Sequence, residues 1–554
     1  MRGSFSFNIN IINKPFNTGN FITDKTARIT FIDNQNNIQQ ITNYGIISTT
    51  EIYNRIFHNE SLNFDNCYVN NFSLSEYRKR FSLDKTKVVI LKNFSANRSF
   101  FEADEIIDFS TASFIGEILS FKNTFFGNGH LSFYKSNYKL TNIVDFSHAF
   151  FGKGRTNFQY SDFHKCDINF TEVINIGDLS FVNTNFGTGR VLFKNVSFGD
   201  GKIEFHFSKF ENSQIIFSKS IFEGEKVDFR RIEFGNGKLD FRRVNFGDAQ
   251  VMFDESEVGL GKTSFKNSRF GKGKLSFYLT NFKAPLSFEK VEFGTGKVSL
   301  FKAKLNHLSF KSCHLDNYLD LRVESCDVID LSDAVVRDII DFQNDFSSVK
   351  IKELNLFGLR NLGKLILDWK LNNVEELIEN QNSTIYQKAE QYRLLKENFH
   401  SYGRYEDEDE AYVRFKRYEL KLNYIDNKKK GGLYSLYAFA NKWFQKILFD
   451  YMGKYATQPF RVLVSMFIIY VFFSFIYFAM MLLELGDLKP AFANPEQMPD
   501  LTLAFYHSAI TFLTIGYGDY APWGIIRILS SFEGFVGLFM MSYFTVAFVR
   551  KILR

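Results

Sequence analysis

The chain has 554 residues, enough for several domains, and a net charge of +6, which is too small at this length to indicate binding to nucleic acid. Phenylalanine is over-represented, with 68 Phe against 3 Trp and 9 Met, and this bias predicts one packing arrangement that is repeated many times. The cysteines are scattered and form no Cys-x-x-Cys pair, which argues against zinc sites and disulfide frameworks and fits a reducing compartment. They are Cys67, Cys166, Cys313 and Cys326.

Residues 1–93 are polar and rich in Asn, with short β-like runs such as "ARITFID". The first residues contain no apolar stretch of the kind found in a cleaved secretory signal. We expect this segment to cap one end of the repeat region that follows. It carries no motif that predicts a function.

Residues 94–370 contain a phenylalanine repeat. One series recurs every twelve residues and a second follows it by five, so the steps alternate between five and seven. A helical period of 3.6 cannot keep such a set on one face, whereas a coil that returns to the same place after a fixed number of residues can. Glycines open most of the seven-residue steps, as in "FGTG" and "FGNG", and permit turns at the corners of a coil. The two series are Phe193, Phe205, Phe217, Phe229, Phe241, Phe253, Phe265 and Phe277, and Phe198, Phe210, Phe222, Phe234, Phe246, Val258, Phe270 and Phe282.

The repeat predicts a β-solenoid with about 24 residues and four inward Phe in each coil, because a twelve-residue coil would be too tight. The five-residue step and the "xxNFxx"-like units resemble pentapeptide-repeat proteins, which implies a right-handed β-solenoid. Two inserted residues depart from the strict five of that family, so the square cross-section stays open. Residues 311–370 are richer in Leu and Ile, and we expect them to form the last coils and their cap.

A mostly basic ladder lies four residues after each phenylalanine of the second series. One interpretation is a solvated edge that opposes aggregation between sheets. The other is an anion-binding or membrane-facing stripe. The ladder consists of Arg190, Lys202, Gln214, Lys226, Lys238, Gln250, Lys262 and Lys274.

Residues 373–430 form a connector of helix-forming residues without proline. Gly403 divides the segment and predicts an antiparallel helix pair. The acidic run at 406–410 predicts a negatively charged first helical turn, with a calcium site as the alternative.

Residues 431–457 contain an amphipathic helix and a linker. Leu436, Tyr437, Trp443 and Phe444 share one helical face, and polar residues lie on the other. Because "NKKK" precedes it and a long apolar run follows, we expect this helix to lie in the membrane interface. An ordinary helix that faces a protein core is the alternative.

Residues 458–554 contain two apolar runs of the length needed to cross a bilayer. Residues 462–483 carry no charge, and Glu533 alone interrupts residues 528–549. The positive-inside rule places both termini in the cytoplasm of a multi-pass protein of the inner or plasma membrane. The basic residues that flank the two runs are Lys442, Lys446, Lys454, Arg461, Arg550, Lys551 and Arg554.

Between the two runs, "LTLAFYHSAITFL" is apolar but too short to span, which predicts a re-entrant helix that leads into "TIGYGD". Irregular backbone at membrane depth occurs where protein buries it or where an aqueous path runs beside it. Four such segments around an axis could replace the water shell of K⁺ with carbonyl oxygens. Gly516 and Gly518 would permit the alternating backbone, Thr514 would add its hydroxyl, and Tyr517 would pack outward.

Residues 460–554 resemble the pore module of two-transmembrane potassium channels. The matching order is an outer helix at 460–484, a pore helix at 501–513, the filter at 514–519 and an inner helix at 524–550. Where that family usually has a second threonine, this chain has Leu513. The resemblance implies a K⁺-binding filter of Thr514, Ile515, Gly516, Tyr517 and Gly518, with Asp519 at its outer mouth.

Three further residues of the inner helix are candidates for a role in the pore. Glu533 is a charge inside a span, and we expect it to support the filter from behind. Gly534 and Gly537 stand where the family commonly has a gating hinge, and close helix packing explains them equally well.

The sequence therefore predicts a homotetrameric K⁺ channel that is gated by its cytoplasmic part. The sequence before the pore predicts no helix with periodic arginines, which argues against voltage sensing. The expected partners are K⁺, the lipid bilayer, three further copies and an unidentified cytoplasmic ligand or protein. No enzyme activity and no cofactor are expected, K⁺ being the permeant ion. The alternative is a membrane-anchored interaction scaffold with a vestigial pore.

Overall fold

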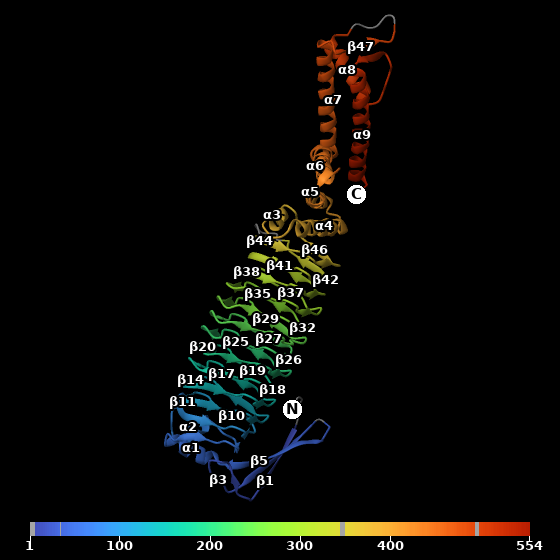
Figure 1. Ribbon diagram of the computed structural model, residues 1–554. Helices are drawn as coiled ribbons and strands as arrows, with labels where there is room; N and C mark the ends of the chain where they lie inside the picture. Colours follow the sequence, from blue (N-terminus) through green and yellow to red (C-terminus); the bar gives the residue numbers. More distant parts are fainter. Residues whose placement is uncertain (1–5, 34, 344–349, 493–497, 554) are drawn as a thin grey trace. The chain divides into compact units, whose positions relative to one another are not determined.

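The computed structural model describes residues 6–33, 35–343, 350–492 and 498–553 (Figure 1). The chain divides into two compact units, Met1–Gln381 and Asn382–Arg554. Each unit has its own architecture: the first is a β-solenoid and the second is helical.

Each coil of the solenoid contains four short strands, one on each of four sides. In one coil these are β21 (Val191–Leu192), β22 (Ser197–Phe198), β23 (Ile203–Glu204) and β24 (Lys209–Phe210). The next strand, β25 (Ile215–Ile216), pairs in parallel with β21, and Val191 lies opposite Ile215. This register confirms the predicted coil of 24 residues and gives the coil four sides.

Parallel ladders run along the solenoid because equivalent strands of successive coils pair with one another. One ladder is a sheet of twelve strands: β10 (Ile106–Asp108), β13 (His130–Ser132), β16 (Thr156–Asn157), β19 (Leu179–Ser180), β23, β27 (Lys226–Asp228), β29 (Gln250–Met252), β33 (Leu275–Ser276), β37 (Val298–Ser299), β40 (Leu319–Asp320), β43 (Ile339–Asp341) and β46 (Lys364–Ile366). The last pairings confirm that residues 311–370 supply the final coils.

The other three sides carry corresponding strands. The second side consists of β7 (Cys67–Asn70), β9 (Phe100–Glu102), β12 (Phe125–Phe126), β15 (Phe150–Phe151), β18 (Ile174–Asn175), β22, β26 (Ile221–Phe222), β32 (Arg269–Phe270), β36 (Glu292–Phe293), β39 (His314–Leu315), β42 (Val335–Val336) and β45 (Arg360–Asn361). The third has β6 (Ser61–Asn63), β8 (Val89–Ser95), β17 (Asp167–Asn169), β21, β25, β28 (Leu239–Asp240), β31 (Thr263–Ser264) and β35 (Leu286–Ser287). The fourth has β20 (Asn185–Gly187), β24, β30 (Glu257–Val258) and β34 (Asn281–Phe282). Five longer strands turn the corner between the last two sides: β11 (Ala112–Ser120), β14 (Asn137–Asp145), β38 (Lys304–Ser309), β41 (Ser325–Asp330) and β44 (Lys350–Asn355).

Phenylalanine fills the interior of the coils. Phe193, Phe198, Phe205 and Phe210 of one coil are all buried, as predicted. Each ring stacks on its equivalent in the next coil; the ring centroids of Phe193 and Phe217, for example, lie 4.7 Å apart. Because burial of one such side chain stabilises a fold by about 1.5–3 kcal/mol, the continuous stacks hold the coils together.

The N-terminal region joins this solenoid through an antiparallel meander of β1 (Ser6–Ile12), β4 (Thr26–Ile32) and β5 (Ile38–Ile47). The small strands β2 (Phe16–Asn17) and β3 (Ile22–Thr23) and the helices α1 (Thr49–Phe57) and α2 (Leu74–Arg80) complete it. Strand β5 pairs in parallel with β7, so the meander extends the second side of the solenoid. Parallel pairing already includes β6 and β7, upstream of residue 94.

The last helix of the solenoid unit is α3 (Val374–Glu379), which packs on β44. The side-chain amide of Gln381 donates to the carbonyl oxygen of Leu354. The division between the units therefore lies at 381–382, after the first helix of the segment that the sequence assigns to the connector.

The second unit starts with the helix pair α4 (Ile385–Ser401) and α5 (Tyr405–Lys429). A capping box at Thr384 and Gln387 begins α4, and Gly403, at φ +77°, makes the turn, as predicted. Helix α6 (Gly432–Gln445) runs on into a π-helical segment, η1 (Lys446–Tyr451).

Helices α7 (Pro459–Leu482) and α9 (Ile526–Ile552) are long and apolar enough to cross a membrane. Helix α8 (Asp500–Phe512) lies between them in the chain and packs on both. An antiparallel pair of strands, β47 (Gly486–Pro490) and β48 (Tyr520–Gly524), which the sequence did not predict, joins the segments on either side of α8.

Candidate functional site

The segment that follows α8 has an alternating backbone. Thr514, Gly516 and Gly518 have φ values of +57°, +63° and +77°, while Ile515 and Tyr517 between them do not adopt positive φ. Glycine takes the left-handed conformation without steric cost, whereas Thr514 is strained there. This alternation lets successive carbonyl groups point to the same side of the segment, which is the geometry that a filter needs.

These residues lie at the surface of the single chain. Leu513 to Gly518 are all exposed, and an added Cβ at Gly516 or Gly518 would meet no atom within 4 Å. The two glycines are therefore needed for their backbone conformation and not because the chain crowds them.

Asp519 is held at the end of the segment by three hydrogen bonds. The Tyr506 hydroxyl donates to its Oδ2 at 2.7 Å, and the backbone N–H of Tyr520 donates to its Oδ1 at 3.1 Å. The backbone N–H of Ala491 donates to its carbonyl oxygen at 2.8 Å. The carboxylate is thus fixed against α8 and β48.

Glu533 is fully buried where α7, α8 and α9 meet. Its Oε2 accepts a hydrogen bond from the Tyr477 hydroxyl of α7, and its Oε1 accepts one from the Ser508 hydroxyl of α8, both at 2.5 Å. A second bond between α8 and α9 joins His507 Nε2 and Ser530 Oγ at 2.8 Å. Glu533 thus contacts the helix before the segment rather than the segment itself.

The two glycines of α9 differ in their surroundings. A Cβ at Gly537 would lie 2.0 Å from the carbonyl oxygen of Phe512, the last residue of α8. A Cβ at Gly534 would have no neighbour closer than 3.9 Å. Close packing of α9 on α8 therefore accounts for Gly537, and a hinge stays a prediction for Gly534.

The C-terminal end of α9 is tied to α5. Asp409 Oδ1 lies 3.0 Å from Arg550 Nη2, and Asp409 Oδ2 lies 3.3 Å from Lys551 Nζ. The Arg550 guanidinium also lies over the ring of Tyr412, 4.3 Å from its centroid. This pairing could not be predicted from the sequence, because Asp409 belongs to the acidic run that indicates a first helical turn.

A second ion pair joins α5 to η1. The Arg417 guanidinium forms three hydrogen bonds with Asp450, at 2.8, 2.9 and 3.2 Å. Both η1 and the segment after it contact α9. The Tyr543 hydroxyl of α9 donates to the carbonyl oxygen of Phe449 in η1 at 3.1 Å and accepts from the Ala456 N–H at 2.9 Å. The base of α9 is therefore held by α5 directly and through η1.

The apolar side of α6 is exposed within the chain. Leu436 is 68% exposed, and Tyr437, Trp443 and Phe444 are exposed as well. The opposite side packs on α5, where Lys442 Nζ lies 4.3 Å from the centroid of the Tyr424 ring. This arrangement favours the interfacial interpretation over a helix that faces a core.

Part of the basic ladder neutralises buried carboxylates. Lys226 lies 3.0 Å from Asp228, which is fully buried and also binds Arg230 at 2.7 Å. Burial works to raise the pKa of Asp228, but the hydrogen bonds from Arg230 and Lys226 outweigh it and hold the pKa below its usual range. The repeated string "K-x-D-F-R" could have revealed this role, which fits a structural edge better than an anion-binding stripe.

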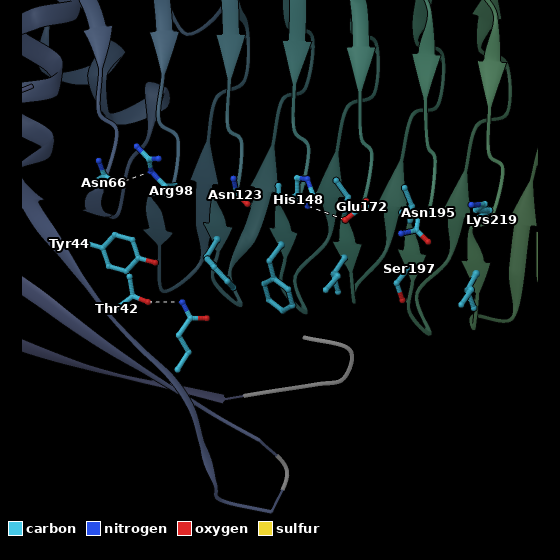
Figure 2. A pocket seen from close by; sticks show the side chains of 18 of the residues that line it. Thr42, Tyr44, Asn66, Arg98, Asn123, His148, Glu172, Asn195, Ser197 and Lys219 are labelled. Carbon is cyan, nitrogen blue, oxygen red and sulfur yellow. Dashed lines mark hydrogen bonds and ion pairs between the residues drawn. The ribbon is translucent and has the colours of Figure 1, made fainter. Parts of the chain in front are cut away.

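A groove of about 690 Å³ lies in the solenoid unit, beside β5 (Figure 2). His148 and Glu172 form an ion pair at 3.2 Å, and Arg98 Nε donates to Asn66 Oδ1 at 3.0 Å, so these lining side chains are already engaged with one another. The residues that the structure describes include no group of three or more His, Cys, Asp or Glu that could hold a metal ion, which leaves the calcium alternative for 406–410 without a ligand set there.

Comparison with known proteins gives one match. Residues 465–554, which are 90 of the 554, match the model of a family described as "Ion channel". No curated protein matches the chain, and no solved structure matches it either. The matched range contains α8, the 514–519 segment and α9, together with most of α7. Over residues 465–554 the chain is thus similar to an ion-channel family, and this stretch follows an N-terminal β-solenoid of about 13 turns.

Proposed function

We propose that the protein is a potassium-selective channel of the cell membrane, assembled from four copies around the 514–519 segment. The observation that carries the proposal is the left-handed backbone at Thr514, Gly516 and Gly518, within "TIGYGD" and between two helices long enough to span a membrane. Four exposed segments of this kind supply rings of carbonyl oxygens that replace the hydration shell of K⁺.

The charges around the two spans support a cytoplasmic location for both termini. Arg461 precedes most of α7, while Arg550 and Lys551 end α9. The connection between the spans carries mainly acidic side chains, with Asp487 and Asp500 among them. The positive-inside rule then puts the solenoid and the helix pair in the cytoplasm.

Control of opening by the cytoplasmic part follows from the contacts at the base of α9. Asp409 and Tyr412 of α5 hold Arg550, and Arg417 holds Asp450 of η1. A movement of α5 would therefore change the position of the helix that lines the inner half of the pore. Because the side chains of these ion pairs are only partly exposed, a displacement of α5 would be transmitted through them to α9 and η1.

The test is ion flux through the purified protein in liposomes. We expect K⁺ flux to exceed Na⁺ flux by orders of magnitude, and Gly516→Asp to abolish it because an aspartate side chain disfavours the required φ. Gly403→Asp is the matched control, since Gly403 also has positive φ and open space around its Cβ position, but lies in the connector. Equal Na⁺ and K⁺ flux, or an assembly other than fourfold, would contradict the proposal and favour a scaffold with a non-conducting pore.

A further inference from the structure

Strand β1 is the terminal strand of the ten-stranded sheet of the solenoid unit. It pairs with β4 along all seven of its residues, and no strand among the described residues pairs with its outer edge. Its sequence, "SFNINII", contains no charge, no proline and no glycine. Natural proteins protect long edge strands with such residues, and β1 has none of them.

The register identifies which backbone groups face outward. The Ile46 N–H donates to the Lys25 carbonyl oxygen at 3.0 Å, so the odd-numbered residues of the neighbouring β4 point their backbone groups toward β5. Even-numbered residues of β4 then point toward β1, where they meet Asn8, Asn10 and Ile12. The N–H and C=O groups of Phe7, Ile9 and Ile11 therefore face the open edge.

These three residues make the edge complementary to itself. A twofold axis at Ile9 brings Ile9 opposite Ile9 of a second copy and Phe7 opposite Ile11, and each opposed pair exchanges two backbone hydrogen bonds. Ile11 is 57% exposed in the single chain, and pairing would cover it with Phe7 of the second copy. The strand carries no charge, so two copies meet without like-charge repulsion.

The side chains of Phe7 and Ile9, which would hold such a pair in place, are already packed within the single chain. Phe7 packs edge-to-face on Phe100 with ring centroids 5.0 Å apart, and Phe7 and Ile9 lie against the buried cluster that includes Ile29 and Tyr44. We propose that the β1 strands of two copies of this chain pair in antiparallel orientation at their outer edges, so that two N-terminal meanders form one continuous sheet. The partner is thus a second copy, and the interface is separate from the pore.

Cysteine cross-linking of the full-length protein tests the pairing directly. All four native cysteines are buried, so an introduced thiol is the reactive one. Ile9→Cys places two thiols on residues whose Cα atoms are about 5.5 Å apart across the pair, within reach of a disulfide. On oxidation we expect on the order of tenfold more covalent dimer than for Ile22→Cys, whose position is 71% exposed on the same meander but away from the edge. Equal dimer yields for the two variants would overturn the proposal.

Two further variants test the register. Asn8 would lie opposite Asn10 of the second copy, so Asn8→Cys alone should give little dimer, while Asn8→Cys combined with Asn10→Cys should give much. Ile11→Lys added to Ile9→Cys should reduce cross-linking several-fold, because it places a charge on the edge, and Ile22→Lys should leave the yield unchanged. Strong cross-linking by Asn8→Cys alone, or no effect of Ile11→Lys, would exclude this pairing.

Discussion

The solenoid and the 514–519 segment differ in how far a single chain covers their residues. In the solenoid, the inward phenylalanines of a coil, such as Phe205, are buried by neighbours from their own chain. In the pore module, Leu513 to Gly518 are exposed in the single chain, and their backbone is strained at Thr514. The first region is therefore covered within one copy, whereas the second would be covered only in the assembly proposed above. The predictions below test this difference, from the largest expected effect to the smallest.

The largest effect is expected from Gly537→Ala. Its Cβ would lie 2.0 Å from the Phe512 carbonyl oxygen, so α9 must separate from α8 and the filter segment loses its support. We expect loss of K⁺ flux and of the fourfold assembly in size-exclusion chromatography. Gly534→Ala is the control for assembly alone: its Cβ has no neighbour closer than 3.9 Å, so the fourfold assembly should persist whether or not a hinge at Gly534 affects flux. Retained flux in Gly537→Ala would contradict this account.

In the solenoid, Phe205→Ala removes a fully buried ring that stacks on Phe181 and Phe229. The expected loss of stability is about 3–5 kcal/mol, and it should be confined to the neighbouring coils because each coil contacts only the next. Hydrogen exchange should show lost protection near Phe181 and Phe229 and unchanged protection in α4 and α5. A loss that spreads evenly over the whole chain would contradict the comparison, and Phe207→Ala, at an exposed corner, is the control.

Asp228→Asn should show a stability effect that depends on pH. The pKa of Asp228 is held below its usual range in the folded chain, so its contribution is present above the unfolded-state pKa of about 3.9 and is lost as pH falls through the folded-state pKa. We expect the variant to be about 1–3 kcal/mol less stable than the parent at pH 7, because Arg230 and Lys226 lose the carboxylate that they bind.

Thermal unfolding measured from pH 7 to pH 2 checks this prediction. The difference in Tm between parent and variant should shrink on acidification below about pH 4. A Tm difference that stays constant over this range would show that the carboxylate charge of Asp228 does not stabilise the solenoid.

The smallest effect concerns the ion pair between α5 and α9. Asp409→Asn and Arg550→Gln should each shift the open probability, and a double-mutant cycle should give a coupling energy of about 1 kcal/mol, as for a partly exposed pair. Single-channel recording of the parent, the two single variants and the double variant in lipid bilayers measures this coupling energy. Glu406→Gln, in the exposed first turn of α5, is the control and should shift nothing. Zero coupling would mean that α5 does not act on the pore through Asp409.

Much of the fold could be predicted because the deciding interactions repeat at short range. The spacing of Phe193, Phe198, Phe205 and Phe210 predicts the coil of 24 residues. The apolar runs and the turn at Gly403 predict the helices of the second unit. The positive φ values of Gly516 and Gly518 could be predicted from "TIGYGD", because they too depend on residues close together in the chain.

The remaining features depend on residues that are far apart in the sequence. Asp409 and Arg550 are separated by 141 positions, and nothing near Asp409 identifies its partner. Glu533 accepts hydrogen bonds from Tyr477 and Ser508, which belong to two other helices. The burial of Glu533 could therefore be predicted, but its hydrogen-bond partners could not. The contact of η1 with α9 likewise joins distant residues, because the Tyr543 hydroxyl donates to the carbonyl oxygen of Phe449, 94 positions away.

The equivalence of successive coils also makes the length of the solenoid adjustable in fixed steps. Val191 and Ile215 occupy the same place one coil apart, so excision of the 24 residues between such points rejoins matching ends. Each excision or duplication would change the axial length by one strand spacing, about 4.8 Å, without altering either terminus of the stack. Both evolution and protein engineering can thus change the length of this domain in steps of one whole coil.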